Sequence, residues 1–271
     1  MKTFRILLIA AACAALAFAQ NPQPPKKKKL LAIGAVAGFQ HDSVSNGLAT
    51  MWKIGHDTGL WDTYIRTDTQ LITKKKIDAG NAKNLDYFDA IYLYTTGELP
   101  LDDEQKASLL SFVHDDGKGI IGGHSSIDTF YKWPAYGEMM GAYFDNHPWG
   151  QFLAPVIVED PNFPAMKDFP RQFLIMDEIY QPSKEFSREK VRVLARLDAT
   201  KIDLKHQGVK RTDGDFAVAW VKNYGKGRVF YSTFGHREEV YDRPDIQTMY
   251  REATKWAMKL IDGDATPRPR P

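Results

Sequence analysis

The chain has 271 residues, with 36 lysines and arginines against 34 aspartates and glutamates and a single cysteine. This near balance of charge argues against a surface that binds nucleic acid. With only one cysteine, the chain cannot form an internal disulfide.

The N-terminus has the three regions of a secretory leader. Lys2 and Arg5 precede an apolar run, and residues 17–19 read Ala-Phe-Ala, a typical cleavage site. The run is shorter than the roughly 20 apolar residues that cross a bilayer. We therefore expect a cleavable signal peptide at residues 1–19, export to the periplasm or the extracellular space, and no membrane span. A buried N-terminal helix and a lipid anchor on Cys13 are the alternatives.

Cleavage at this point would remove the only thiol and two positive charges, which leaves 34 basic and 34 acidic residues. Residues 20–29, rich in proline and lysine, are predicted to be a solvated linker. Residues 264–271, rich in proline and arginine, are predicted to be a disordered, extended tail. Residues 30–263 show neither a repeat nor a second linker, so they are predicted to form one large domain.

Apolar runs without polar alternation are typical of strands buried on both faces. Such runs lie at residues 30–36, 90–94, 118–122, 218–221 and 228–234. A sparser apolar run at residues 61–66 is expected to form a strand at the sheet edge. The segment 147–215 is less regular, and we expect it to add strands and loops over the edge of the site.

Helical patterns separate these strands. A first helix is expected at residues 45–58, with Leu48, Met51 and Trp52 facing the core. Asp102 and Gln105 form a predicted capping box at the start of a second helix. An apolar stripe from Met249 to Leu260 predicts the last helix. The alternation predicts an α/β fold with a doubly wound, mostly parallel sheet and helices on both faces.

In open α/β sheets, ligands bind outside the carboxyl ends of the strands. Glycine and polar residues follow four of the predicted strands at their carboxyl ends. The residues beside these glycines are His41, Glu98 after Gly97, His124 with Ser125, and His236. His147 is a fourth candidate histidine, whereas His56, His114 and His206 are expected at the surface.

The segment from Gly122 to Ser126 resembles a strand–turn–helix elbow, but His124 stands where a nucleophilic serine or cysteine would lie. Serine hydrolase chemistry is therefore disfavoured. Asp177 and Glu178 follow an apolar stretch, and adjacent strand residues face opposite ways. Only one of these carboxylates can face a given pocket, where it could act as a general acid or base.

Imidazoles and carboxylates also bind zinc, so His41, His124, His147 and His236 are candidate metal ligands. No local ligand pair fixes such a site, and no nucleotide-binding fingerprint follows the first strand. Aromatic residues between the histidine segments suit sugar rings, although they equally suit core packing.

Residues 122–133 and 136–149 resemble the trehalose-utilisation (ThuA-like) family, as do Phe39–Ser43, Asp177–Tyr180, Tyr224–Tyr231 and Gly235-His236. The resemblance covers about residues 30–261. It implies a flavodoxin-like sheet similar to that of class I glutamine amidotransferases, with His124 where those enzymes carry cysteine. It also implies a role in disaccharide breakdown through 3-keto sugars, without amidotransferase activity.

We therefore expect an enzyme that converts a glycoside or keto-sugar. His124 or His236 is the predicted base, Glu178 or Asp177 assists it, and His41 and His147 orient the sugar or hold a divalent metal. The residues predicted to contact the small-molecule sugar are His41, Gly97, Glu98, Ser125, Tyr131, Trp133, His147, Trp149 and Tyr180. A non-catalytic sugar-binding accessory protein and a zinc-dependent hydrolase are the alternatives.

Overall fold

The computed structural model describes residues 26–270. The predicted signal peptide at residues 1–19 and most of the predicted linker lie outside the described residues. Within residues 26–270, no helix is long and apolar enough to cross a membrane.

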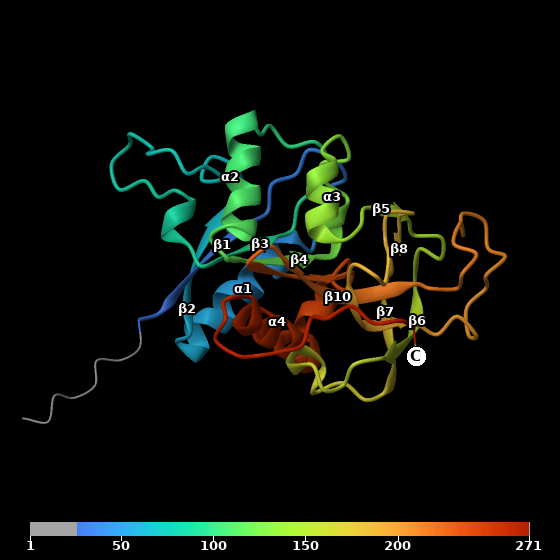
Figure 1. Ribbon diagram of the computed structural model, residues 1–271. Helices are drawn as coiled ribbons and strands as arrows, with labels where there is room; N and C mark the ends of the chain where they lie inside the picture. Colours follow the sequence, from blue (N-terminus) through green and yellow to red (C-terminus); the bar gives the residue numbers. More distant parts are fainter. Residues whose placement is uncertain (1–25, 271) are drawn as a thin grey trace, which may run out of the picture.

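A nine-stranded sheet forms the centre of the molecule (Figure 1). Five neighbouring strands are parallel, in the order β2 (Trp61–Arg66), β1 (Lys28–Ile33), β3 (Ala90–Leu93), β4 (Gly119–Gly123) and β11 (Gly227–Ser232). The sheet continues through antiparallel pairs to β10 (Ala217–Tyr224), β9 (Arg192–Leu197), β6 (Gln151–Val158) and β7 (Gln172–Glu178). Because each antiparallel pair reverses the strand direction, only β10 and β6 run opposite to the other seven strands. The predicted α/β fold with a mostly parallel sheet is confirmed.

Helices cover both faces of this sheet, with α2 (Asp103–His114) and α3 (Pro134–Met140) on one face and α1 (Val44–Thr58) and α4 (Pro244–Ala257) on the other (Figure 1). Strand β1 shows why its sequence is apolar throughout. Leu30 packs in the core beneath α1 and α4, whereas Leu31 packs in the core beneath α2 and α3. Short 3₁₀ turns, η1 to η4, lie at Leu85–Tyr87, His124–Ile127, Pro164–Met166 and Glu238–Asp242. A separate ribbon pairs β5 (Phe144–Asn146) with β8 (Gln181–Pro182).

The edge strand and the start of α2 agree with the sequence-based predictions. Strand β2 lies at the sheet edge, and the Asp102–Gln105 capping box is present. Trp52 was expected inward but is 48% exposed and stacks on His56. The apolar stripe predicts that Leu260 lies in the last helix, but α4 ends at Ala257 and Leu260 is exposed. In both cases one apolar residue was wrongly included in the buried face of a helix.

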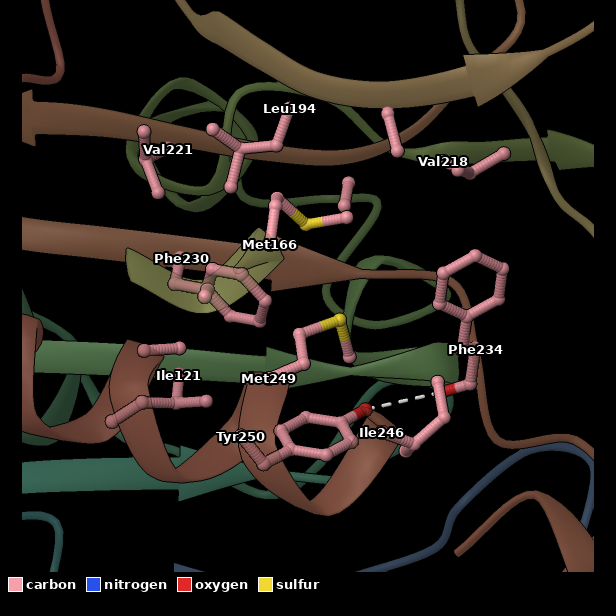
Figure 2. Close-up of a cluster of buried hydrophobic side chains, with 14 of the residues drawn as sticks. Ile121, Met166, Leu194, Val218, Val221, Phe230, Phe234, Ile246, Met249 and Tyr250 are labelled. Carbon is pink, nitrogen blue, oxygen red and sulfur yellow. Dashed lines mark hydrogen bonds between the residues drawn. The ribbon is translucent and has the colours of Figure 1, made fainter. Parts of the chain in front are cut away.

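Helix α4 packs on the sheet and is hydrogen-bonded to the segment that follows β11. Figure 2 shows Met249 and Tyr250 among buried side chains of the sheet, including Phe230 and Ile121. The Tyr250 hydroxyl donates a hydrogen bond of 3.0 Å to the Phe234 carbonyl. This bond fixes the backbone immediately before Gly235 and His236.

The antiparallel half of the sheet curls back toward the parallel half. Strand β7 is four places from β11 in sheet order. Even so, the Asp177 carboxylate accepts hydrogen bonds from the backbone N–H groups of Gly235 and Arg237, at 2.8 and 3.1 Å. The segment 147–215 thus adds strands, as predicted, and its curl brings the end of β7 to the end of β11.

The C-terminal segment packs along β9. Arg192 forms an ion pair with Asp264, and Ala265 is buried. Arg268 lies 3.9 Å from Asp160. The tail predicted to be disordered at residues 264–271 therefore has defined contacts in its described part, which its composition alone did not reveal.

Candidate functional site

Four side chains from four strand ends meet at the carboxyl edge of the sheet. His41 follows β1, His124 follows β4, His236 follows β11, and Glu178 is the last residue of β7. One ligand atom from each lies within 4.8 Å of all the others. The three residues other than His236 are buried, and His236 is half-buried. We call these four residues the histidine–glutamate cluster.

His124 is held in a strained backbone conformation at the elbow, with φ of 34°. Gly123 precedes it because a Cβ there would lie 2.6 Å from the Tyr92 hydroxyl oxygen. His124 Nδ1 is 2.6 Å from the Thr233 carbonyl oxygen, so Nδ1 carries the proton and donates it. Nε2 is then an unprotonated acceptor, and it has no hydrogen-bond partner.

His236 is positioned by the unusual backbone of Gly235, whose φ is 122°. The hydroxyls of Ser43 and Tyr94 lie 2.7 and 2.8 Å from the Gly235 carbonyl oxygen, and Asp177 accepts the Gly235 N–H. Burial raises the pKa of Asp177 to about 7, against the opposing effect of these N–H donors. Asp177 thus positions the loop, while its neighbour Glu178 faces the histidines, in agreement with the expectation that adjacent carboxylates face opposite ways.

Glu178 lies at the centre of the histidines. Its Oε1 is 3.2 Å from His236 Nδ1 and 3.7 Å from His124 Nε2, and its Oε2 is 3.6 Å from His147 Nδ1. The contact with His236 lacks hydrogen-bond alignment, and His236 Nδ1 is otherwise without a partner. Burial opposes the charged form of His236, but the Glu178 carboxylate outweighs it and raises the His236 pKa.

His41 completes the cluster. Its Nε2 lies 3.3 Å from the Tyr180 hydroxyl, whereas its buried Nδ1 has no partner. Burial, with a further contribution from His236, lowers the pKa of His41 to about 4, and burial lowers the pKa of His124 well below its usual value. Both rings are therefore neutral imidazoles at pH 7, the form that binds metal ions.

The cluster fits a divalent metal ion. Each of the three imidazole rings has a buried nitrogen without a hydrogen-bond partner, and the rings lie around one carboxylate. Unpaired buried polar atoms are costly unless something satisfies them. Nitrogen and oxygen donors of this kind suit zinc, and also iron or manganese. Of the four predicted metal-binding histidines, His147 is outside the cluster: its side chain is 45% exposed and approaches the other oxygen of Glu178.

Asp128 belongs to the surroundings of the site, although the sequence analysis did not single it out. Burial raises its pKa, and the charges of His147 and Glu178 also act on it. The Tyr131 hydroxyl donates to Asp128 Oδ1 at 2.5 Å. Its position four residues after His124, in the same elbow segment, was the available signal.

The remaining predicted contact residues separate into two groups. Tyr180 packs on His124, with ring centroids 4.3 Å apart, and the buried hydroxyl of Ser125 has no partner. Tyr131 lies at the neighbouring cavity described below. The others have packing or backbone contacts: Gly97 passes against Gly38, Glu98 accepts the Lys132 N–H, Trp133 packs on Phe130, and Trp149 packs on Phe216 and donates to the Asp203 carbonyl.

Residues of the cluster line two cavities. One, of about 330 Å³, is lined by His41 and His236 together with Phe39, which is 65% exposed, and the other, of about 630 Å³, is lined by His41. A further cavity of about 590 Å³ is lined by the aromatic rings of Tyr131, Tyr143 and Phe144 and by no residue of the cluster. The cluster is therefore a histidine–carboxylate centre with open space beside it, at the edge where α/β proteins bind ligands.

Comparison with known proteins identifies the family. The model of the ThuA family, described as trehalose utilisation, matches residues 29–257, so the chain belongs to this family. The family description supports a carbohydrate-related role. A search of curated proteins found no match.

Solved structures share the fold. A ThuA-like protein from Bacteroides uniformis has 19% identity and a TM-score of 0.67, with 87% of this chain and 94% of that chain covered. A ThuA-like protein from Parabacteroides merdae has 16% identity and a TM-score of 0.65, with 87% and 91% covered. The cytoplasmic protein STM3548 from Salmonella typhimurium has 12% identity and a TM-score of 0.54, with 85% and 98% covered.

Proposed function

We propose that this protein is a metal-dependent enzyme of carbohydrate breakdown that converts a glycoside or its keto derivative. The observation that carries the proposal is the convergence of three imidazole rings and Glu178 beside open cavities, where each ring has a buried nitrogen without a hydrogen-bond partner. The family description, trehalose utilisation, supports sugars as the substrate class.

His41, His124, His236 and Glu178 would hold the ion, for which zinc is our first candidate. A bound ion of this kind polarises a carbonyl or hydroxyl oxygen of the sugar. A ring nitrogen that serves as a ligand cannot also take a proton from the substrate. We therefore revise the expected role of His124 and His236 from base to ligand.

Proton transfer then falls to groups beside the cluster. His147 Nδ1 lies 3.6 Å from Glu178 Oε2 and the side chain is half-exposed, which places an imidazole suited to general acid–base catalysis beside the cluster. Asp128 is a second carboxylate on this side, held by the Tyr131 hydroxyl. Asp177 is occupied by the Gly235 and Arg237 N–H groups and acts by positioning His236.

These groups suit elimination from a 3-keto-glycoside. The ketone acidifies the adjacent C–H bond, and a base removes this proton. The electron pair forms a C=C bond as the glycosidic C–O bond breaks, and the departing oxygen takes up a proton. The products are an unsaturated keto-sugar and a free alcohol, so the step needs no oxidant or reductant.

Metal content and turnover test the proposal together. The protein is purified without a metal-affinity column, its metals are measured by mass spectrometry, and it is assayed on 3-keto-trehalose and a 3-keto-glucoside. We expect about one metal ion per chain, loss of turnover with a chelator, and recovery when zinc, manganese or iron is restored. His124→Ala and Glu178→Gln should lose both the metal and the turnover.

His56→Ala and His114→Ala are matched controls, because both histidines are exposed on helices and away from the cluster. They should retain full metal content and turnover. A cluster variant that keeps both would refute the ligand assignment. Sugar binding without turnover would instead favour an accessory protein, and zinc-dependent turnover of unoxidised trehalose would favour a hydrolase.

We further propose that residues 1–19 direct export, on the basis of their charged, apolar and Ala-Phe-Ala regions. Expression of the full chain in a bacterium, followed by N-terminal sequencing of the periplasmic and secreted fractions, tests this. We expect Gln20 as the first residue. Intact protein confined to the cytoplasm would contradict it.

A further inference from the structure

Phe39 is an exposed aromatic residue beside the histidine–glutamate cluster. It is 65% exposed, and it lines the cavity of about 330 Å³ together with His41 and His236. Its ring meets the His41 ring edge to face, with centroids 4.8 Å apart. Single exposed apolar residues are common on protein surfaces. Phe39 differs from them because it shares a concave, partly polar site with two residues of the cluster, which is typical of ligand contact.

The segment that carries Phe39 is fixed to the loop that follows β3. The Ala37 N–H donates to the Thr96 carbonyl at 2.9 Å, and the Thr96 hydroxyl donates to the Phe39 carbonyl at 2.9 Å. A Cβ on Gly97 would lie 2.6 Å from the Gly38 nitrogen, so the two segments are in close contact. Because its backbone is already ordered, Phe39 can contact a ligand at a small cost in conformational entropy.

The same cavity contains groups that accept hydrogen bonds. The exposed carboxylates of Asp42 and Glu238 line it, and within residues 26–270 neither makes an ion pair or a side-chain hydrogen bond. The guanidinium of Arg237, also in the lining, already donates to Gln151 at 2.9 Å and to Glu239 at 3.0 Å. The lining therefore offers carboxylate oxygens to a ligand that carries several hydroxyl groups.

We propose that the sugar ring that reacts at the cluster binds in this cavity, with its apolar C–H face on the ring of Phe39 and its hydroxyls directed to Asp42 and Glu238. This assignment rests on the proposed function for the reaction itself. The C–H bonds of a pyranose face complement the negative face of an aromatic ring. His41 and His236 line the same cavity, so a ring held there adjoins the proposed metal ligands. The volume lies at the lower end of the range for small-molecule sites, about 300–1,000 Å³, and thus suits a single ring.

Binding of an uncleavable analogue tests the assignment without turnover. The probe is the 3-keto derivative of anhydroglucitol, which has the ring and the ketone of the proposed substrate but no glycosidic bond. Its affinity for the protein as purified is measured by calorimetry. Phe39→Ala should weaken binding about tenfold because the aromatic face is lost, whereas Phe39→Tyr keeps this face and should stay within about twofold. Asp42→Asn should weaken binding about threefold. Trp52→Ala, which removes an exposed aromatic residue of α1, is the control and should leave the affinity unchanged.

Wild-type affinity in Phe39→Ala would overturn the assignment, and so would a wild-type protein that does not bind the analogue. If the affinity for the analogue depends on Phe39 but no keto-glycoside is turned over, the proposed reaction fails while the assignment stands. If keto-glycosides are turned over, and neither their KM nor the affinity for the analogue responds to Phe39→Ala, the assignment fails while the reaction stands.

Discussion

Arg188 is the side chain whose loss should most weaken the curled half of the sheet. Its guanidinium donates two hydrogen bonds to Glu159, at 2.8 and 2.9 Å, and two to Asp215, at 2.6 and 2.7 Å. Glu159 follows β6 and Asp215 precedes β10. The exposed fractions of the three side chains are 10% for Arg188, 1% for Glu159 and 9% for Asp215.

Arg188→Met should lower the free energy of unfolding by about 3 kcal/mol. Removal of one partner from a buried ion pair typically costs about 3–5 kcal/mol, because the remaining charge is left without compensation. We expect the lower end because Arg196 Nε remains 2.7 Å from Glu159 Oε1. In a domain of this size the loss corresponds to a decrease in Tm of about 6–12 °C.

Urea unfolding followed by circular dichroism at pH 7 measures the loss. Lys53→Met is the control, since Lys53 and Asp57 form an exposed i,i+4 ion pair, and such surface pairs contribute little to stability. Adding Asp215→Asn to Arg188→Met should recover part of the loss, because one uncompensated carboxylate is then neutral. The reasoning is refuted if Arg188→Met costs no more than the control.

Three further predictions concern the site and its support. Tyr250→Phe removes the hydrogen bond to Phe234 and should cost about 1 kcal/mol in urea unfolding; no loss would mean that packing alone holds α4. Gly235→Ala would place a Cβ 2.4 Å from the Tyr241 hydroxyl oxygen at a φ of 122°, so we expect about 3 kcal/mol of destabilisation and reduced metal content. In metal-free protein, the His41 pKa is about 4 when folded and near 6.5 when unfolded, so the unfolded chain binds more protons between these values. Stability should fall by about 3 kcal/mol as the pH drops from about 6.5 to 4, and His41→Gln should flatten this part of the urea-midpoint profile.

The parallel half of the fold was predictable because its signals are local. Apolar runs without alternation marked β1, β3 and β4, and the capping box marked the start of α2. The rule that ligands bind at the carboxyl ends of the strands then groups His41, His124 and His236 from the sequence alone. These three residues follow parallel strands whose order is constrained by the α/β pattern itself.

The position of Glu178 relative to the histidines was not predictable in the same way. Its strand joins the sheet at the far edge, and only the curl returns it to β11. Such a curl depends on long-range pairing that no short window of sequence encodes. The aromatic predictions were less specific because burial and ligand contact favour the same residues, and Trp149 and Trp133 proved to pack against the protein.

The ligand positions also have a consequence for folding. His41 and His236 are 195 residues apart (236 − 41), and Glu178 arrives only after the outermost strand has paired. Contacts of such sequence separation form slowly, because the chain must close a long loop first. A metal ion bound by all four side chains would therefore report a completed sheet, and a chain truncated before β11 would lack His236 and with it a complete centre. Metal occupancy could thus serve as a sensitive assay for correctly folded material.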